Sequence, residues 1–577
     1  MRKLLLMLKY LCQLTFKKSI ACFGGFLPLP LCLLAQTSGI PLQSPSYHIL
    51  DRLEILSGVE SPIHPELKFS NRRDASSYAL RLDSMAGGRL SRKDHADIQY
   101  LLDENNEWLA DTSRYLRRTS GRGLLKYFYR TPANFFEVNT PYFKLRANPM
   151  LNFHLGREAG EGEMIFQNQR GLEVRGEVDQ HLFFYTNLVE SQARFPRYIS
   201  GRIDEFSAVP GAGFFKRYNS KLLDIHNGYD FNIATAYLGF QASRHFGIQF
   251  GHGKHFIGNG HRSMFLSDFG APTFFLKLDT RVWKFHYQNL FLELSPVSKV
   301  PGGTLLPKKY AAIHYFNYKV TPRLALGFFE ATIFNRSRQF EFQYLNPVIF
   351  YRTVEGMIGS PDNVVLGLDG RWNLFRQVQF YGQLMLDEWV ISEIFSRSGW
   401  WANKWGIQTG LKYVNAFGLD HPDFQLEHNR ARPFTYSHYD PANSYTHYNQ
   451  PLAHPLGANF EETLALVRWQ PISRLLLQAR FIHVRMGENT PSENWGSNPL
   501  LDYNTRQQDY GNEIGQGVAA RVNLIGFDAS WTLWHNVFAD FKLLYRKKDS
   551  DDNSRDLSTQ ILSAGVRMNM WNPNMDF

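Results

Sequence analysis

Cysteine is almost absent from the chain. The 577-residue sequence contains three cysteines, Cys12, Cys22 and Cys32, and all of them lie within the first 35 residues. If this leading segment is removed on export, the rest of the chain has no thiol. Such a composition excludes disulfide scaffolds, thiol catalysis and cysteine-based metal sites.

Long apolar runs are also missing after the first 35 residues, and the mean hydropathy is −0.34. A membrane-spanning helix needs about 20 apolar residues in succession, so helical spans are excluded there. A membrane β-barrel escapes this objection, because only every second residue of a strand must be apolar. Aromatic residues make up 15% of the chain, which fits the aromatic girdles of such barrels. A large soluble β-sandwich can have the same composition.

The sequence has no concentrated basic patch and no common catalytic motif. Removal of the first 35 residues takes away five positive and no negative charges, so the formal net charge of +10 becomes +5. This mild excess is no argument for nucleic-acid binding. No Gly-x-Ser-x-Gly motif occurs, and no helix follows the glycines at residues 251–260 to complete a phosphate cradle. We therefore predict neither enzyme activity nor a cofactor.

Four histidines, His245, His252, His255 and His261, fall close together. Imidazole is the commonest metal ligand, but no carboxylate lies at ligand spacing, and a strand would place His252 and His255 on opposite faces. A metal site and polar histidines of a loop or rim are the two interpretations. The second is favoured, so no metal site is predicted.

The first 35 residues have the composition of a secretory signal. Five Lys and Arg residues precede an uncharged run over residues 19–35 that contains two glycines and two prolines. The run is short for a membrane anchor, and cleavage is expected near Ala35. Cys32 is a weak candidate for lipidation, because Leu31 stands where a small residue is required. We expect residues 1–35 to be a signal peptide.

Residues 36–140 are not strand-like. Apolar residues recur at helical spacing over residues 47–56 and 92–109, and Ser91 with Asp94 has the pattern of a capping box. We predict a small helical region in the periplasm, followed by a barrel over residues 141–577.

From residue 142 onward the pattern has a period of two. In the last segment, Leu562, Ala564 and Val566 alternate with small or polar residues, which places the two sets on opposite faces of a strand. Short and long connections also alternate, as in an outer-membrane meander with periplasmic turns and outer loops. The strands are expected to begin near residues 142, 164, 182, 231, 246, 273, 282, 309, 324, 364, 378, 404, 422, 461, 474, 516, 537 and 557.

These eighteen segments, with sixteen as the fallback, predict an all-β fold: a transmembrane antiparallel β-barrel closed by pairing of the last strand with the first. Thr280 and Arg281 are expected to form one of its short turns. The predicted location is the outer membrane of a Gram-negative cell. Outer-membrane lipid and the barrel-assembly machinery are then expected partners.

Charged residues alternate with the apolar face and are expected to line the lumen. They are Lys277, Lys284, Asp369, Arg371, Asp387, Arg480, Lys542 and Arg567. A selective pore and an ion-pair network that fills the interior are the two interpretations. The network is favoured, because paired buried charges are the usual structural solution.

Aromatic residues gather in two of the long connections. The candidates for glycan contact are Trp400, Trp401, Tyr436, Tyr439, Tyr445 and Tyr448. Exposed rings beside amides and cations are suited to stacking on sugar faces. Packing within the loops is an equal alternative for the tyrosines.

Residues 246–294 resemble the capsule-assembly Wzi family and the related RemB-type gliding-motility proteins of Bacteroidetes. The resemblance rests on the G-H-G-K-x-F-I-G-N-G-x-R-S-x-x-L-S-D block and is supported by residues 190–202, ESQARFPRYISGR. The motif positions are Gly251, Gly258, Asn259, Gly260, Arg262, Ser263, Ser267 and Asp268. The resemblance implies an outer-membrane barrel with a periplasmic helical bundle that retains capsular polysaccharide as a lectin, but it assigns no glycan contact to these positions.

Three functions follow as expectations. The leading one is a non-enzymatic barrel that binds surface polysaccharide through its outer loops, in capsule attachment or in gliding motility. The others are a solute channel and a scaffold for surface adhesins or secretion partners.

Overall fold

The computed structural model describes residues 37–110, 112–119, 127–220, 225–300, 304–336, 341–359, 362–388, 390–571 and 575–577. The expected signal peptide at residues 1–35 lies outside the described residues. From residue 37 onward, the described residues belong to one compact unit.

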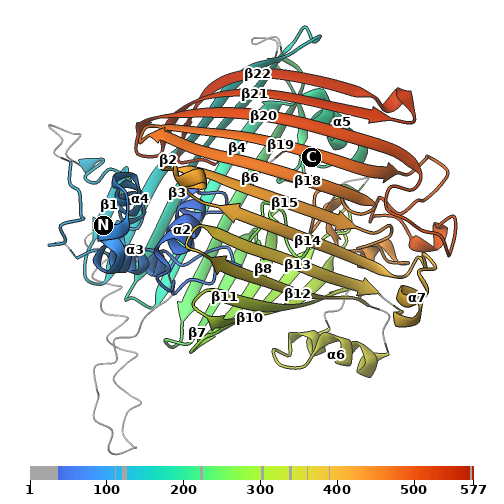
Figure 1. Ribbon diagram of the computed structural model, residues 1–577, viewed down its shortest axis with the longest axis horizontal. Helices are drawn as coiled ribbons and strands as arrows, with labels where there is room; N and C mark the ends of the chain where they lie inside the picture. The colour runs from blue at the N-terminus through green and yellow to red at the C-terminus, as the bar shows by residue number, and fades with distance from the viewer. Residues whose placement is uncertain are drawn as a thin grey trace, which may run out of the picture. The chain divides into compact units, whose positions relative to one another are not determined.

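Eighteen antiparallel strands form a closed barrel (Figure 1). In order around the barrel they are β2 (Phe143–Glu158), β3 (Met164–Val178), β4 (Leu182–Arg194), β6 (Ile225–Gln241), β7 (Phe246–Gly253), β8 (Thr273–Val282), β9 (Phe285–Leu294), β10 (Lys309–Thr321), β11 (Leu324–Phe334), β12 (Asn363–Leu374), β13 (Val378–Glu388), β14 (Lys404–Tyr413), β15 (Pro422–Ala431), β18 (Phe460–Ile472), β19 (Leu475–Glu488), β20 (Val518–Trp534), β21 (Val537–Ser550) and β22 (Leu557–Met568). β22 pairs with β2 from Leu151↔Met568 to Glu158↔Ile561. The predicted strand number and the predicted closure are confirmed.

Four short strands add to this frame. They are β1 (Phe136–Asn139) beside β2, β5 (Lys216–Ser220) beside β6, and the separate pair β16 (Thr446–His447) and β17 (Gln450–Pro451). β1 pairs with residues 144–147 of β2 and β22 with residues 151–158. Pro149 lies between these two stretches, where that edge of β2 has no partner among the described strands. Proline has no backbone N–H to donate, and this is tolerated at an unpaired strand edge.

Side chains alternate between the lumen and the outer face. On β13, Gln379, Tyr381 and Gln383 are buried, while Phe380 between them is 47% exposed. Large exposed apolar residues occur around the ring of strands: Phe153, Leu172, Leu188, Leu238, Phe250, Leu326, Leu368, Phe380, Leu426, Phe481, Ile525, Leu543 and Val566. An apolar surface of this extent is unfavourable in water and is typical of a barrel that faces lipid.

Short and long connections lie at opposite ends of the barrel, as predicted. The short-turn end carries connections such as residues 179–181, 375–377 and 535–536, and the long-loop end carries residues 195–220, 254–272, 341–359, 432–459 and 489–517. One turn was misplaced: β8 continues to Val282, and Trp283 and Lys284 form the turn, with Trp283 at φ 54°. Thr280 and Arg281 therefore belong to a strand. Lys284 lies at the short-turn end and not in the lumen, which corrects its assignment.

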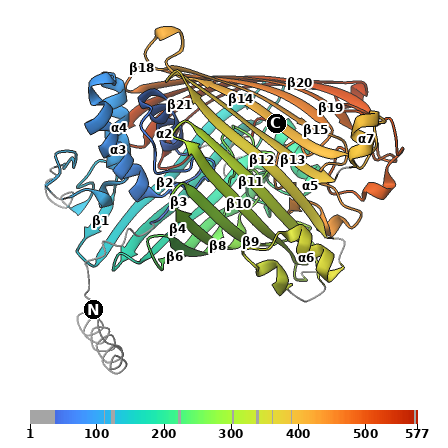
Figure 2. The same cartoon turned by 60° about the horizontal axis from the view of Figure 1, so that its bottom comes forward.

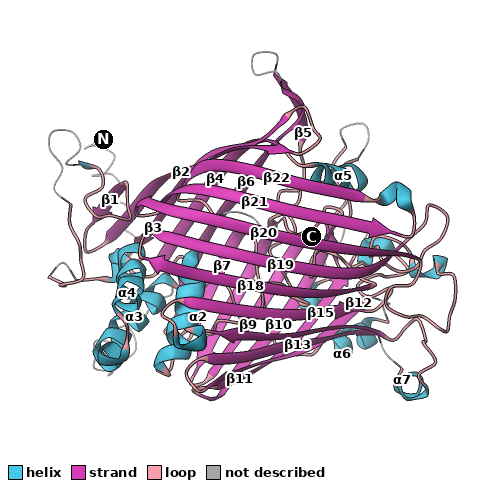
Figure 3. Ribbon diagram, turned by 45° about the horizontal axis from the view of Figure 1, so that its top comes forward, coloured by secondary structure: helices cyan, strands magenta, loops and turns pink. Residues whose placement is uncertain are grey.

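Within the described residues, three helices precede the barrel and lie at its short-turn end (Figure 3): α2 (Pro45–Ser57), α3 (Arg72–Ala86) and α4 (Arg92–Glu104). The capping box of Ser91 and Asp94 opens α4, as predicted. α3 was missed, although Ala75, Tyr78 and Leu82 have helical spacing and are buried. None of the described helices is both long and apolar enough to cross a membrane.

The remaining helices lie near the long-loop end, where Figure 1 shows α6 and α7. They are α5 (Arg197–Phe206), α6 (Tyr351–Ile358) and α7 (Ile391–Ser396). Short 3₁₀ helices are η1 (Gly87–Arg89), η2 (Asn106–Trp108), η5 (Phe342–Leu345), η6 (Ala416–Gly418), η7 (Pro441–Asn443), η8 (Tyr503–Thr505) and η9 (Asn553–Arg555).

Candidate functional site

The lumen at the short-turn end is filled by α2 and the segment that follows it. Arg371 on β12 pairs with Glu54 at 3.0 Å and with Glu66 at 2.8 Å. Lys412 on β14 pairs with Asp51 at 2.7 Å. Burial alone would raise the pKa of the Asp51 carboxyl, but the nearby Lys412 ammonium lowers it to about 2. These inward-facing charges of the wall therefore fix the helix by buried ion pairs.

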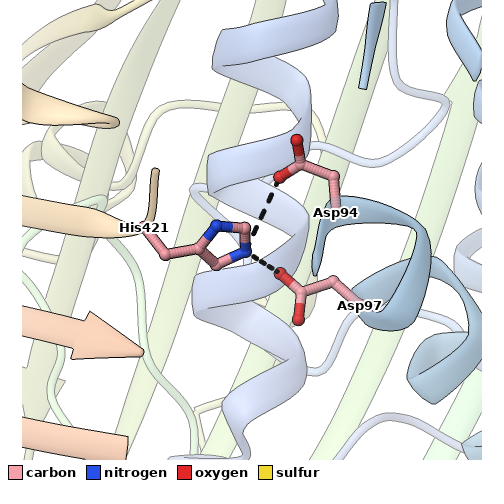
Figure 4. Close-up of side chains that lie close together, drawn as sticks. All are labelled: Asp94, Asp97 and His421. Carbon is pink, nitrogen blue, oxygen red and sulfur yellow. Dashed lines mark ion pairs between the residues drawn. The ribbon is translucent and has the colours of Figure 1, made fainter. Parts of the chain in front are cut away.

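A second set of contacts joins the helices to the turn between β14 and β15. Figure 4 shows the His421 ring facing Asp94 and Asp97 of α4, at 3.7 and 3.5 Å. These three residues are close enough to hold a metal ion. However, the Arg52 guanidinium already contacts Asp94 at 2.8 Å and Asp423 at 2.8 Å. The arginine supplies the positive charge that the carboxylates need, so the group is an ion-pair cluster that connects α2 and α4 to the barrel.

The middle of the lumen is filled by the connection between β7 and β8, residues 254–272, which carries most of the family motif. It contacts the N-terminal segment, since the Gly258 N–H donates to the Glu66 carbonyl at 2.7 Å. It also contacts the wall, since the Met264 N–H donates to Gln383 Oε1 at 2.8 Å. The motif therefore lies inside the barrel and not in an exposed loop.

Two motif glycines let this connection approach the wall. Gly258 has φ +148°, and a Cβ there would lie 2.8 Å from Gln383 Nε2. A Cβ on Gly260 would lie 2.5 Å from the Glu427 carboxylate. That carboxylate accepts the N–H groups of His261 at 2.7 Å and Arg262 at 3.0 Å. A larger residue at position 260 would displace the acceptor of both bonds.

Arg262 is the centre of the largest buried charge network around the motif. Its guanidinium pairs with Glu462 at 3.0 Å and with Asp576 at 2.9 Å, and all three side chains are almost fully buried. Asp576 is the penultimate residue, and the side chain of Phe577 packs against Phe269. The C-terminal residues therefore fold back into the lumen and are held there by a motif arginine.

The other motif positions have packing roles or face a cavity. A Cβ on Gly251 would lie 2.2 Å from the Ala236 carbonyl oxygen of the adjacent strand. Ser263 Oγ donates to the Ile257 carbonyl, and Ser267 Oγ to that of Ala453. Asp268 accepts from Gln43 Nε2 at 2.9 Å. The buried Oδ1 of Asn259 has no hydrogen-bond partner among the described residues, and this residue lines the cavity described below.

The connection between β15 and β18, residues 432–459, closes the lumen from the long-loop end. Tyr436 and Tyr445 are each 1% exposed and stack on each other, and the Tyr436 hydroxyl donates to the Met264 carbonyl at 2.9 Å. The expectation that these two tyrosines are exposed is wrong. This polar connection folds inward because its hydrogen-bond partners lie on the motif connection.

The remaining lumen candidates are mostly paired. Asp369 accepts from the Tyr315 hydroxyl, Asp387 contacts Lys404, Arg480 contacts Asp528, and Arg567 contacts Asp540. Lys277 lies 5.8 Å from the centre of the Phe69 ring. Lys542 lines a cavity of about 460 Å³ that lies between α2, the motif connection and the wall of β19 to β22. Seven Lys and Arg residues and four Asp residues line this cavity.

The four clustered histidines do not converge. His245 contacts the Arg281 carbonyl at a short turn, and His252 contacts the Ala234 carbonyl. His255 is buried against Phe275, while His261 pairs with Asp576 at 3.2 Å. Their rings therefore lie in four different environments.

Three long connections bring aromatic residues together at the long-loop end. Trp401 lies 4.7 Å from Tyr503, and Trp400 lies 5.0 Å from Tyr510, measured between ring centres. Tyr439 lies 6.1 Å from Tyr503. Tyr503 and Tyr510 were missed, although they lie in a connection that the sequence predicts to be an outer loop. We name these five residues the outer aromatic cluster.

The outer aromatic cluster combines buried and exposed rings. The indole nitrogens of Trp400 and Trp401 are buried, and no described residue accepts a hydrogen bond from them. The Arg506 guanidinium lies over the Trp401 ring at 4.2 Å. Tyr510 is 54% and Tyr439 38% exposed. Tyr448, the remaining candidate, lies apart from the cluster, against His447.

No protein-family model matches the chain, and no curated protein matches it. Among solved structures, it is similar to Wzi of Escherichia coli, described as an outer-membrane protein involved in group 1 capsule assembly and a carbohydrate-binding β-barrel. The TM-score is 0.55 at 13% identity, over 93% of this chain and all of that one. It is also similar to the outer-membrane protein OprD of Pseudomonas aeruginosa, with a TM-score of 0.41 at 10% identity, over 74% of this chain and 93% of that one. The likeness to Wzi shows a shared fold, and the likeness to OprD is too distant to bear on function.

Proposed function

We propose that the protein is a Wzi-like barrel of the outer membrane that binds surface polysaccharide at its long-loop end and is not an enzyme. The proposal rests on three segments that fill the lumen from one end to the other, which are together named the column of chain. The N-terminal segment, the motif connection and residues 432–459 fill the lumen in succession and contact one another. A lumen filled in this way favours recognition outside the barrel over transport through it.

The orientation follows from the two ends. Outer-membrane barrels have short turns in the periplasm and long loops at the cell surface. We infer that α2, α3 and α4 lie on the periplasmic side, that lipid surrounds the apolar belt and that the barrel-assembly machinery inserts the chain after export by residues 1–35. The outer aromatic cluster then lies at the cell surface.

The outer aromatic cluster is the proposed glycan site. Aromatic faces stack on the apolar faces of sugar rings. Tyr439 and Tyr510 supply exposed faces of this kind. Trp400 and Trp401 pack against Tyr510 and Tyr503 and hold these rings in place. Tyr436 and Tyr445 have no part in this site, because they are buried.

The proposal is tested by the binding of purified protein to the native surface polysaccharide of the source cell, measured by calorimetry. Loss of one stacking ring removes about 1 kcal/mol, so Tyr510→Ala, which removes a ring that is 54% exposed, is expected to weaken binding about 5-fold. The matched control is Trp534→Ala, because Trp534 is 73% exposed but lies at the short-turn end. No binding by the unaltered protein, or an equal loss in both variants, would reject the site.

The role in the cell is tested by deletion of the gene. We favour retention of capsular polysaccharide, for which deletion releases polysaccharide into the medium. Retained polysaccharide with loss of surface spreading would assign the protein to gliding motility instead.

A solute channel is the second candidate, and the lumenal cavity favours it. Its seven Lys and Arg residues exceed its four Asp residues, which suits an anionic solute. A channel would require the column of chain to move. Electrical conductance of the purified protein separates this candidate from the first.

A further inference from the structure

One long connection lies against the outside of the barrel and not over its mouth. Residues 341–359, which contain η5 and α6, are named the outer arm. Figure 2 shows α6 beside the barrel, close to β9 and β10. Tyr344 and Tyr351 of the arm pack on Phe334 and Ala312, which belong to β11 and β10. The arm therefore covers part of the face that elsewhere carries the apolar belt.

The covered part of the wall includes a row of polar residues beside these apolar contacts. Asn289, His314 and Glu330 form one row across β9, β10 and β11, because His314 is directly opposite both of the others. They face outward, since the neighbouring Phe329 and Tyr315 point into the lumenal core. His314 and Glu330 lie 3.6 Å apart and are buried by the arm.

The arm supplies contacts to every member of this row. The backbone N–H of Arg352 donates to Glu330 Oε1 at 3.2 Å, and the Asn289 side-chain Nδ2 donates to the Pro347 carbonyl at 3.3 Å. The Tyr351 ring stacks on His314 with 3.9 Å between ring centres. A carboxylate facing hydrocarbon is strongly unfavourable. The arm removes Glu330 from that environment.

The opposite surface of the arm is apolar and open. Val348 is 80% exposed, Met357 68% and Phe350 58%. Phe350 also contacts Phe328 at 5.8 Å between ring centres, and Phe328 is in register with the exposed Leu368. The open apolar surface of the arm is therefore continuous with the apolar belt of the barrel.

We propose that the outer arm is a lipid-binding element whose Val348, Phe350 and Met357 lie in the surface leaflet of the membrane, over the polar row that it covers. Continuity with the belt identifies lipid as the occupant. A protein partner would need a separate surface, whereas lipid already surrounds the adjoining residues. The arm extends the lipid-facing surface beyond the strands.

The test uses the scarcity of cysteine. In a chain with Cys12, Cys22 and Cys32 replaced by Ser, a nitroxide label is placed at Val348→Cys, Phe350→Cys or Met357→Cys, and the protein is reconstituted in phosphatidylcholine–phosphatidylglycerol vesicles. Leu368→Cys is the control within the belt, and Tyr510→Cys is the aqueous control. Collisions with oxygen and with a water-soluble nickel chelate are compared by electron paramagnetic resonance.

The arm labels are expected to collide with oxygen as often as the belt control does, and several-fold less with nickel than the aqueous control. Nickel collisions equal to those of the aqueous control would overturn the proposal. Labels shielded from both reagents would also overturn it, because they would indicate burial against protein. All three substitutions are at exposed positions, so loss of folding does not obscure the result.

Discussion

The lumen and the long-loop surface differ in whether their side chains are paired within the chain or exposed. In the lumen, Arg262 meets two carboxylates and Arg371 meets two more, all of them buried. At the long-loop surface, the rings of Tyr439 and Tyr510 are 38% and 54% exposed. The charges of these lumenal pairs are satisfied within the chain, whereas the exposed rings of the surface are available to another molecule. The contrast agrees with the proposal that the interior maintains the structure and that recognition takes place outside.

Of the changes predicted here, loss of Arg262 should lower the stability of the protein most. Arg262→Ala leaves Glu462 buried without its arginine and removes from Asp576 the nearer of two arginines, the other being Arg480 at 3.6 Å. A broken buried pair costs about 3–5 kcal/mol. We expect a lower urea midpoint of unfolding in detergent and protease cleavage within residues 254–272. The control is Arg170→Ala, because Arg170 and Glu190 form an exposed pair of the kind worth about 0–1 kcal/mol. Equal effects of the two variants would show that the lumenal network does not hold the interior.

As the pH falls, the segments that fill the lumen should lose stability before the long-loop surface is affected. Burial lowers the pKa of His64 and His255 well below the usual value, and it lowers that of His447 to about 3. These histidines lie in the three segments that fill the lumen. Since the unfolded histidine has a pKa of about 6.5, their contribution is complete above that pH and is lost as pH falls toward the folded value.

For His447 alone, the loss at about pH 5 is about 2 kcal/mol, because one pH unit corresponds to about 1.4 kcal/mol. Limited proteolysis at about pH 7.5 and about pH 5 should show faster cleavage of the lumenal segments in acid. His447→Gln retains a donor and an acceptor but does not titrate, so part of the pH dependence should disappear. An unchanged profile in this variant would contradict the assignment.

A larger side chain at position 260 should lower the stability of the protein less than loss of Arg262 does. Gly260→Ala places a methyl group against the Glu427 carboxylate and the Arg262 carbonyl, at a cost of about 1–3 kcal/mol for overpacking. The matched control is Gly162→Ala, because a Cβ at position 162 meets nothing within 4 Å. A thermal midpoint lowered in the first variant and unchanged in the second is expected. Equal midpoints would show that the glycine is not needed for the close approach.

The barrel was predictable from the sequence because its signal is local. Alternation along each strand gave eighteen segments, and all eighteen are present. The misplaced turn lies at Trp283, which adopts a positive φ without the Gly or Asn that usually marks such a turn. Phe375 and Arg376 form a turn that also lacks these residues, and it was predicted correctly. Where turn chemistry is atypical, alternation alone leaves the boundary between strands uncertain by a few residues.

The filled lumen was not predictable in the same way. Residues 432–459 are mostly polar, as exposed loops are, and the burial of this connection and of residues 254–272 depends on partners far along the chain. Arg262 and Asp576 are separated by 314 positions, and Arg371 and Glu54 by 317. No local pattern encodes such pairs. The outer aromatic cluster was found in part, because Trp400 and Trp401 are adjacent in sequence, whereas Tyr503 and Tyr510 come from another loop.

The closed lumen is tested most directly by the electrical conductance of purified protein in a planar lipid bilayer at neutral pH. The ion-paired column of chain predicts no steady current, with at most brief openings. Steady open-pore currents would contradict it and would favour a channel with its solute site in the lumenal cavity.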